Sequence, residues 1–157
     1  MSRNFGVALG ADTKALTGLE MLQGMVAGDV PSPHMAKTAN IHITEAEEGR
    51  VVFEGAPEER HQNPAGTTHG GWYAMILDSA LGCVVMSCLP VGVTYTTSEY
   101  KVNLIRAIPT GRQMRAIATA DHVGRSTGVA TAELYGIDDG KLYGKATTTC
   151  LIMKKPD

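Results

Sequence analysis

Apolar side chains near the start of the chain recur every three or four positions, which is the spacing of one helical face. The members of this series are Leu16, Leu19, Leu22, Met25 and Val26. The spacing predicts an amphipathic helix with Asp12 or Thr13 as its N-cap and Gly28 just past its end.

After Pro31-Ser32-Pro33 the pattern changes to the alternation of strands. Apolar residues at positions 41, 43, 51 and 53 flank the turn Glu48-Gly49-Arg50 and predict a β-hairpin. Residues 61–71, HQNPAGTTHGG, contain too much glycine and proline for regular structure. Residues 72–89, WYAMILDSALGCVVMSCL, are apolar on all sides, which predicts a helix surrounded by protein.

Four further segments follow Pro90-Val91-Gly92 and have the pattern of strands. They span residues 94–106, 112–123, 127–137 and 141–153. The turns between them are PTG at 109–111, GRS at 124–126 and DDG at 138–140, of which DDG is a strong hairpin signal. Strands of this length joined by tight turns predict an antiparallel meander.

These elements predict an α+β fold in which one antiparallel β-sheet wraps around a long central apolar helix. The N-terminal helix is extra to that arrangement. Residues 1–35 are therefore assigned to a helical extension and residues 36–157 to a single domain. The sheet would have open edges, and a homodimer that continues the sheet would cover one of them.

Composition narrows the class of protein. Hydrophobic residues make up 43% and charged residues 19%, with a formal net charge of −2, so there is no electrostatic footprint for nucleic acid or an anionic membrane. The first thirty residues contain no continuous apolar stretch, so no signal peptide is expected. Three cysteines cannot all pair, and reduced cysteines in a cytoplasmic protein are the simplest interpretation.

Asp78 is the only charged residue between His69 and Leu89. The segment approaches transmembrane length, but a carboxylate in mid-membrane is costly and no second span is present, so a core helix is favoured. Inside a protein, an ionised carboxylate must be paired, protonated or placed at a cleft. Asp78 alone therefore fits a structural role and a chemical role equally well.

Gly70 and Gly71 make the chemical role of Asp78 more plausible. They lie at the entry of the predicted helix, where unpaired N–H groups and the positive end of the helix dipole favour an anion. Asp78 follows Gly70 by eight residues, which is ~12 Å along one helix. That separation is too large for both to hold one carbonyl carbon within a single helix. A twofold axis would bring Asp78 of one subunit near Gly70 of the other, and a shared active site is the resulting hypothesis.

Residues 61–82 combine H-x-N-P-x-G-x-x-H-G-G with L-D-x-A-x-G, and this combination resembles the phenylacetate-pathway (PaaI-like) type of hotdog-fold acyl-coenzyme A (CoA) thioesterase. The leading helix, the hairpin TANIHITEAEEGRVVFEG, the segment VNLIRAIPTG and the last three strands also fit, so the resemblance covers most of the chain. It implies the hotdog fold and hydrolysis of an acyl- or aryl-acyl-CoA. It also implies dimers paired into homotetramers, with no metal and no cofactor apart from the CoA of the substrate.

The resemblance implies roles for particular residues. Asp78 corresponds to the catalytic carboxylate, as general base or nucleophile, and the Gly70 N–H to the oxyanion-hole donor. Asn63 would position the thioester or the water. A hydroxyl from the opposite subunit would come from Thr97, or from Thr96 if the register differs by one residue.

Besides Thr96, four residues are candidates for binding the substrate. Gly71 shares the helix entry with Gly70, and His69 would shape that entry or touch the thioester. Arg125 and Arg106 are candidates for the CoA phosphates, because a guanidinium suits phosphate geometry. A solvated hairpin arginine is the alternative for Arg125, and a structural salt bridge is the alternative for Arg106.

Three other patterns carry less weight. GRSTG at 124–128 matches the nucleophile-elbow motif G-x-S-x-G, but β-branched strand residues follow it instead of a helix, so a turn between strands is favoured. The spacing of His61, His69 and Asp78 fits no standard zinc pattern. Trp72 and Tyr73 are more typical of a core than of a pocket.

Three functions remain as alternatives to thioester hydrolysis. A hotdog dehydratase or hydratase pairs a histidine with the acidic residue, whereas the predicted central helix offers an aspartate and no histidine. An acyl-CoA-binding sensor usually carries a DNA-binding segment, and the N-terminal region is neither basic nor long enough for one. A structural dimer without activity is the third.

Overall fold

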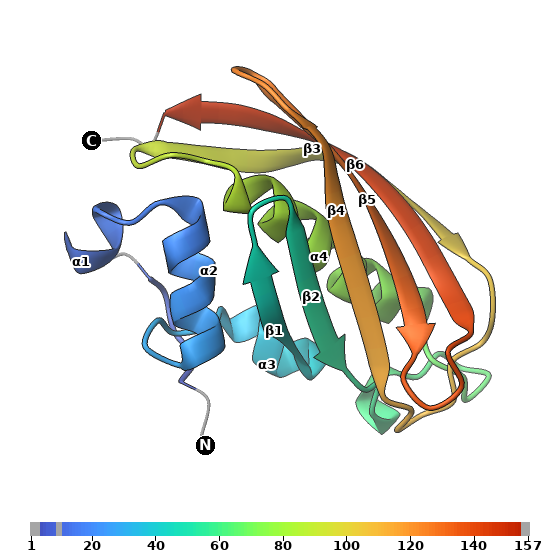
Figure 1. Cartoon of the computed structure of the whole chain (residues 1–157). Coiled ribbons are helices and arrows are strands. Elements are labelled where there is room, and N and C mark those ends of the chain that lie inside the picture. Colours follow the sequence, from blue (N-terminus) through green and yellow to red (C-terminus); the bar gives the residue numbers. More distant parts are fainter. Residues whose placement is uncertain (1–3, 9–10, 155–157) are drawn as a thin grey trace.

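The computed structural model describes residues 4–8 and 11–154. Its elements run in the order α1 (Ala11–Lys14), α2 (Gly18–Ala27), α3 (His34–Ala39), β1 (Ile41–Glu47), β2 (Arg50–Gly55), the short 3-10 helix η1 (Glu59–His61), α4 (Gly70–Ser87), β3 (Val93–Leu104), β4 (Met114–Val123), β5 (Thr127–Gly136) and β6 (Leu142–Lys154). The six strands form one antiparallel sheet in the order β1-β2-β4-β5-β6-β3, which curves around α4 (Figure 1). The predicted architecture is therefore confirmed.

The central helix α4 is apolar on all sides because protein surrounds it. It packs against every strand of the sheet and against α2 and α3. Its fully buried side chains include Trp72, Ile76, Leu77, Leu81 and Val84. By length and composition alone α4 could cross a membrane, but 56% of it is buried inside the structure. Enclosure by the sheet accounts for its apolar character.

Strand β3 corrects the predicted meander. The hairpins β1–β2, β4–β5 and β5–β6 pair as predicted. β3, however, does not pair with β4. It crosses to the far edge of the sheet and pairs with β6, from Val93 opposite Lys154 to Leu104 opposite Gly144, while β4 pairs with β2. The segment between β3 and β4 is consequently a crossover connection rather than a hairpin turn.

The N-terminal helix α2 begins later than predicted. Its N-cap is Thr17 rather than Asp12 or Thr13. The Thr17 hydroxyl oxygen accepts the Glu20 N–H, and the Glu20 carboxylate accepts the Thr17 N–H, which is the reciprocal arrangement of a capping box. Gly28 ends the helix as predicted, in the left-handed conformation with φ 91°.

A second short helix in this region, α3, was not predicted. Its six residues are too few to show helical periodicity, and they contain the residue-35 boundary of the predicted N-terminal extension. The indole Nε1–H of Trp72 donates to the Ala39 carbonyl at 2.7 Å. This hydrogen bond ties the end of α3 to the beginning of α4, so the segment before β1 has a fixed position over the central helix.

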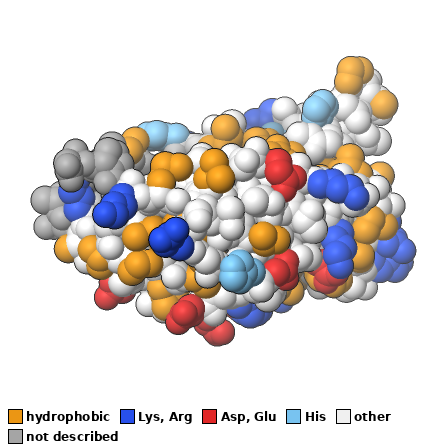
Figure 2. All heavy atoms as spheres, turned by 90° about the horizontal axis from the view of Figure 1, so that it is seen from above, with side chains coloured by type: hydrophobic (Ala, Val, Ile, Leu, Met, Phe, Trp, Pro, Cys, Tyr) orange, Lys and Arg blue, Asp and Glu red, His pale blue; other side chains and the backbone are white. Residues whose placement is uncertain are grey.

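The surface carries charges of both signs. Basic and acidic side chains lie among one another on the face seen in Figure 2, with hydrophobic side chains spread between them. This distribution agrees with the formal net charge of −2. The basic stripe that a nucleic-acid-binding surface requires is absent from this face.

Candidate active site

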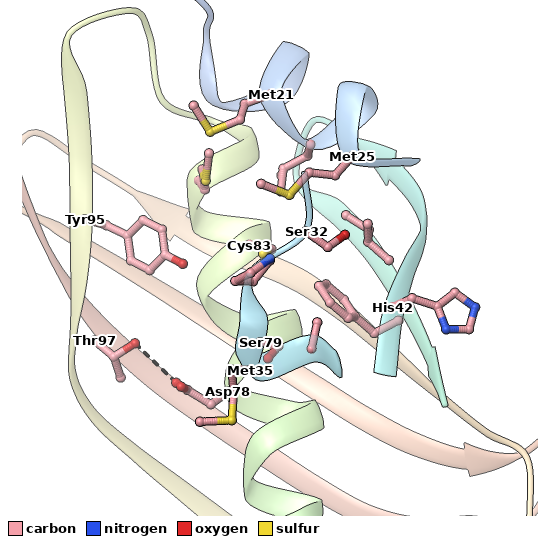
Figure 3. Close-up of a pocket in the computed structure, with 16 residues that line it drawn as sticks. Met21, Met25, Ser32, Met35, His42, Asp78, Ser79, Cys83, Tyr95 and Thr97 are labelled. Carbon is pink, nitrogen blue, oxygen red and sulfur yellow. Dashed lines mark hydrogen bonds between the residues drawn. The ribbon is translucent and has the colours of Figure 1, made fainter. Parts of the chain in front are cut away.

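A cavity of about 300 Å³ lies between the N-terminal helices, the first hairpin, α4 and β3. Figure 3 shows the 16 residues that line it. They are Met21, Leu22, Met25, Ser32, Pro33, Met35, Ala36, His42, Ile43, Phe53, Asp78, Ser79, Cys83, Met86, Tyr95 and Thr97. Most of these side chains are apolar, and Asp78 is the one carboxylate among them. The cavity is therefore an apolar pocket with a single acidic group.

Asp78 and Thr97 lie side by side in the wall of this cavity. The Thr97 hydroxyl donates to Asp78 Oδ1 at 3.2 Å, and the dashed line in Figure 3 marks this bond between α4 and β3. Burial raises the pKa of Asp78 above its ordinary value, and the hydrogen bond from Thr97 partly opposes that rise. A carboxylate whose pKa is raised accepts a proton more readily, which is the property of a general base.

The position of Thr97 adds to one expectation. The Thr97 hydroxyl reaches Asp78 within the same chain, whereas the resemblance implies a hydroxyl from the opposite subunit. Thr96 is exposed and pairs with Leu151. Because successive strand residues point to opposite faces of a sheet, Thr96 points away from Asp78. Of the two threonines considered, the structure brings only Thr97 to the carboxylate.

Gly70 is the first residue of α4 and lies two turns before Asp78. His69 is the N-cap of this helix, and its Nδ1 accepts the Gly71 N–H at 2.8 Å. Within the part of the chain that the structure describes, no group accepts the Gly70 N–H. The cap therefore occupies the Gly71 N–H and leaves the Gly70 N–H available to an external acceptor, while His69 shapes the helix entry.

Asn63 organises its own loop in this chain. Its Oδ1 accepts the N–H groups of Ala65 at 2.9 Å and Thr67 at 3.2 Å. Its Nδ2 donates to the Thr67 hydroxyl at 2.8 Å. The structure thus places Asn63 in the loop that leads into α4 and does not bring it to Asp78 of the same chain.

The remaining predicted residues lie outside the cavity. His61 has both ring nitrogens occupied, by the Glu58 N–H and by the Thr38 carbonyl. The guanidinium of Arg106 donates to the Leu142 carbonyl at 2.6 Å, and within residues 4–8 and 11–154 it forms no salt bridge. Arg125 is exposed in the turn between β4 and β5, where the G-x-S-x-G match is a turn between strands as favoured above. Among residues 4–8 and 11–154, no group of three or more His, Cys, Asp and Glu side chains is placed to hold a metal ion.

Cys83 and Tyr95 line the cavity but were not singled out from the sequence. Burial, together with the charge of Asp78, raises the pKa of the Cys83 thiol to about 12, so the thiol stays protonated and is not a nucleophile at neutral pH. The ring of Tyr95 packs against Gly82, where a Cβ atom would lie 2.5 Å from the tyrosine hydroxyl. Gly82 is the last glycine of L-D-x-A-x-G. It is therefore the one signal in the sequence that points to the wall of the cavity formed by Tyr95.

Comparison with known proteins identifies the family. Residues 65–143, just over half of the 157-residue chain, match the thioesterase superfamily. No match was found among curated proteins.

Solved structures share the fold. A phenylacetic acid degradation-related protein from Ralstonia eutropha is 26% identical, with a TM-score of 0.76 over 83% of this chain and 98% of its own. The E. coli PaaI protein from the phenylacetic acid degradation operon is 21% identical, with a TM-score of 0.74 over 88% and 95%. A hypothetical thioesterase from Streptococcus pneumoniae, solved with coenzyme A, is 25% identical, with a TM-score of 0.70 over 79% and 95%. The chain belongs to the thioesterase superfamily, has its hotdog fold and is a thioester hydrolase.

Proposed function

We propose that this thioesterase hydrolyses acyl-CoA thioesters with Asp78 as the catalytic carboxylate. The observation that carries the proposal is the position of Asp78, which faces an apolar cavity, has a raised pKa and accepts a hydrogen bond from Thr97. An acyl chain suits the cavity, and the coenzyme A in the Streptococcus pneumoniae structure supports CoA as the thiol part of the substrate. Arg125 and Arg106 remain predicted partners of the CoA phosphates.

The chemistry needs an activated oxygen and a stabilised oxyanion. Asp78 takes a proton from a water molecule, whose oxygen forms a bond to the thioester carbonyl carbon. The Gly70 N–H donates to the resulting oxyanion, and collapse of the tetrahedral intermediate breaks the carbon–sulfur bond. The proton held by Asp78 passes to the leaving thiolate, which yields the free acid and CoA. No metal or other cofactor is required for these steps.

We further propose that two chains complete each site. β3 ends the strand order of the sheet, so its outer edge is free for pairing. Large hydrophobic side chains are exposed on and beside β3, namely Tyr100, Leu104 and Ile105. Leu104 lies next to Gly70, since a Cβ atom there would be 3.1 Å from the leucine Cδ1. A second copy pairing along β3 would cover this apolar surface and bring its own helix entry to the region of Asp78. Pairing of such dimers into a homotetramer, and a cytoplasmic location, remain predictions.

The direct test is release of thiol from a panel of aliphatic and aromatic acyl-CoA substrates by the purified full-length protein. Turnover of at least one substrate, with saturation kinetics, would support acyl-CoA hydrolysis. Tight binding without turnover for every substrate would instead indicate an acyl-CoA sensor and overturn the proposal.

Mixing two inactive variants tests whether the site is shared. We expect Asp78→Asn and Gly70→Pro each to be nearly inactive alone. If Asp78 and Gly70 of different subunits act together, each mixed dimer has one intact site, and random exchange restores about a quarter of the wild-type activity. The measurement is thiol release after the two proteins have been unfolded and refolded together. Activity that stays at the level of the separate variants would show that each chain uses its own Gly70.

Replacing Thr97 by valine tests the hydrogen bond to the carboxylate. Because this bond lowers the pKa of Asp78, its loss should raise that pKa further and move the acidic limb of the kcat/KM profile to higher pH. The variant should also lose at least about tenfold in kcat/KM at neutral pH, since hydrogen bonds to charged groups contribute about 1.5–3 kcal/mol. Thr97→Ser keeps the hydroxyl and is the matched control. A valine variant whose acidic limb coincides with that of the wild type would contradict the role of this bond.

A further inference from the structure

We propose that helix α2 forms the end wall of the acyl pocket and limits the acyl group to about eight to ten carbons, so that the substrate is a medium-chain acyl-CoA. This inference rests on the proposed thioesterase function and adds to it the class of acyl group. The argument depends on where the lining residues come from, how long the pocket is and how firmly its end wall is held.

Most of the pocket wall comes from the N-terminal part of the chain. The lining residues that precede residue 44 number nine of the 16, and they are Met21, Leu22, Met25, Ser32, Pro33, Met35, Ala36, His42 and Ile43. All nine lie outside residues 65–143, which match the thioesterase superfamily. The matched part supplies Asp78 and Thr97, whereas the N-terminal part encloses most of the space in front of them. Selection of the acyl group is therefore a property of this segment.

The central helix gives the length of the pocket. Asp78, Cys83 and Met86 all line it and follow one another along α4. The eight residues from Asp78 to Met86 span ~12 Å at 1.5 Å per residue. An extended acyl chain advances ~1.3 Å per carbon, given carbon–carbon bonds of about 1.5 Å. The distance therefore accommodates about nine carbons beyond the level of the carboxylate.

The volume of the pocket is compatible with this length. The cavity measures about 300 Å³. A methylene group is similar in size to a water molecule, whose share of liquid volume is about 30 Å³, so a chain of about ten carbons has a volume similar to that of the cavity. Shorter acyl groups would leave part of this apolar space unfilled, and longer ones would meet its far wall.

Methionines close the end of the pocket opposite Asp78. Figure 3 shows Met21 at the end of the cavity away from Asp78, with Cys83 and the ring of Tyr95 in between. α2 is held in that place by close backbone contacts at its first residue, Gly18. The Gly18 N–H donates to the Leu89 carbonyl at 3.0 Å, and a Cβ atom at this glycine would lie 1.8 Å from the Met86 carbonyl oxygen. The helix backbone is thus fixed against the end of α4, while the flexible tips of the methionines fill the space in front of it.

Changing the size of Met21 should change the preferred acyl length. The experiment measures kcat/KM for acyl-CoA substrates of 2 to 16 carbons and for phenylacetyl-CoA, using the full-length protein. Wild type should be most active near eight to ten carbons, on the length argument above. Met21→Trp shortens the pocket by about two methylene groups, and each methylene that no longer fits costs about fourfold in kcat/KM. The ratio of kcat/KM for decanoyl-CoA to that for butanoyl-CoA should therefore fall about 15-fold. Met21→Ala lengthens the pocket and should move the optimum to longer chains.

Met153→Trp is the matched control, because Met153 is an exposed methionine on β6 that does not line the cavity. It should leave the ratio unchanged. Circular dichroism and thermal melting show whether each variant folds. If Met21→Trp does not fold, the opposite shift in acyl length expected for Met21→Ala still tests the proposal.

The outcomes separate this inference from the proposed function. If acyl-CoA is hydrolysed but the length profile is the same in wild type and both Met21 variants, α2 is not the end wall and the inference is wrong. The same holds if phenylacetyl-CoA is preferred over every aliphatic substrate. If no thioester is hydrolysed at all, the proposed function is wrong and the inference fails with it. A profile that shifts in opposite directions in the two variants would support both.

Discussion

Asp78→Asn should lower kcat for acyl-CoA hydrolysis by about 10³-fold, within the range expected for loss of a general base, and should at the same time raise the melting temperature. The two effects are expected together because the carboxylate is needed for the reaction but costs stability when ionised. Asparagine has the same shape and its amide oxygen can accept the Thr97 hydroxyl, so the hydrogen bond between α4 and β3 remains. Its amide cannot take a proton from water.

The stability effect follows from the raised pKa of Asp78. Below the ordinary pKa of an aspartate, the carboxyl is protonated in both the folded and the unfolded chain, and it imposes no ionisation penalty. As the pH rises between the unfolded and folded pKa values, the unfolded chain loses its proton first, so the free energy of unfolding decreases. Above the folded pKa the wild type bears the full penalty, and the asparagine variant does not. The gain in melting temperature should therefore disappear as the pH is lowered.

Asp121→Asn is the matched control. Asp121 also accepts a hydrogen bond from a threonine, Thr131, at 2.7 Å, but this pair is exposed on the sheet. The control should retain wild-type kinetics and should not gain stability from burial effects. If Asp78→Asn instead loses stability and retains turnover, Asp78 has a structural role and the proposed mechanism is wrong.

Gly70→Pro should reduce kcat by about 10²–10³-fold, which corresponds to about 3–4 kcal/mol for one oxyanion donor. Proline lacks the N–H that is proposed to stabilise the oxyanion. The backbone should tolerate it, because Gly70 is the first residue of α4 and proline is favoured at that position. The preceding residue, His69, has φ −63° and ψ 140°, which is the extended conformation preferred before proline.

Gly70→Ala separates the loss of the donor from the effect of a side chain. Alanine adds the same Cβ near the flexible tip of Leu104, at 3.1 Å, but keeps the N–H. We expect it to lose less than about tenfold in kcat, since a contact of 3.1 Å is relieved by a shift of a few tenths of an ångström at the leucine tip. Both variants are compared by steady-state kinetics on the same acyl-CoA. Equal losses in proline and alanine variants would mean that crowding, not the missing donor, is responsible.

The fold was predictable from the sequence wherever the signal is local. The apolar run of α4 and the turn residues of the β4–β5 and β5–β6 hairpins determine elements whose partners are adjacent along the chain. The position of β3 was not predictable in this way, because an alternating pattern indicates a strand but not its neighbour in the sheet. The N-cap of α2 was missed although Thr17-x-x-Glu20 is a local capping-box signature.

The residues of the active site were likewise predictable only where the signal in the sequence is local. Asp78 stands out because it is the single charge in an apolar helix, and Gly70 because a helix entry has unpaired donors. Thr97 was predicted only through the family resemblance, because nothing in the strand pattern distinguishes one threonine from another. Met21 and Tyr95 could not be recognised, because an apolar residue that faces a cavity has the same sequence pattern as one that faces the core.

The crossover of β3 has a consequence for how the chain reaches this structure. The hairpins β1–β2, β4–β5 and β5–β6 join residues close in sequence, whereas the β3–β6 ladder joins Leu104 to Gly144 and Val93 to Lys154. Contacts between such distant residues raise the contact order, and the loop they close must be ordered before they contribute. The β2–β4 ladder is also long-range, since it joins Gly55 to Met114 and Arg50 to Thr119. We therefore expect both ladders to form after the hairpins. Since Thr97 lies on β3, the hydrogen bond to Asp78 would form only once β3 has joined the sheet, and chains in which only the hairpins have formed would lack an assembled active site.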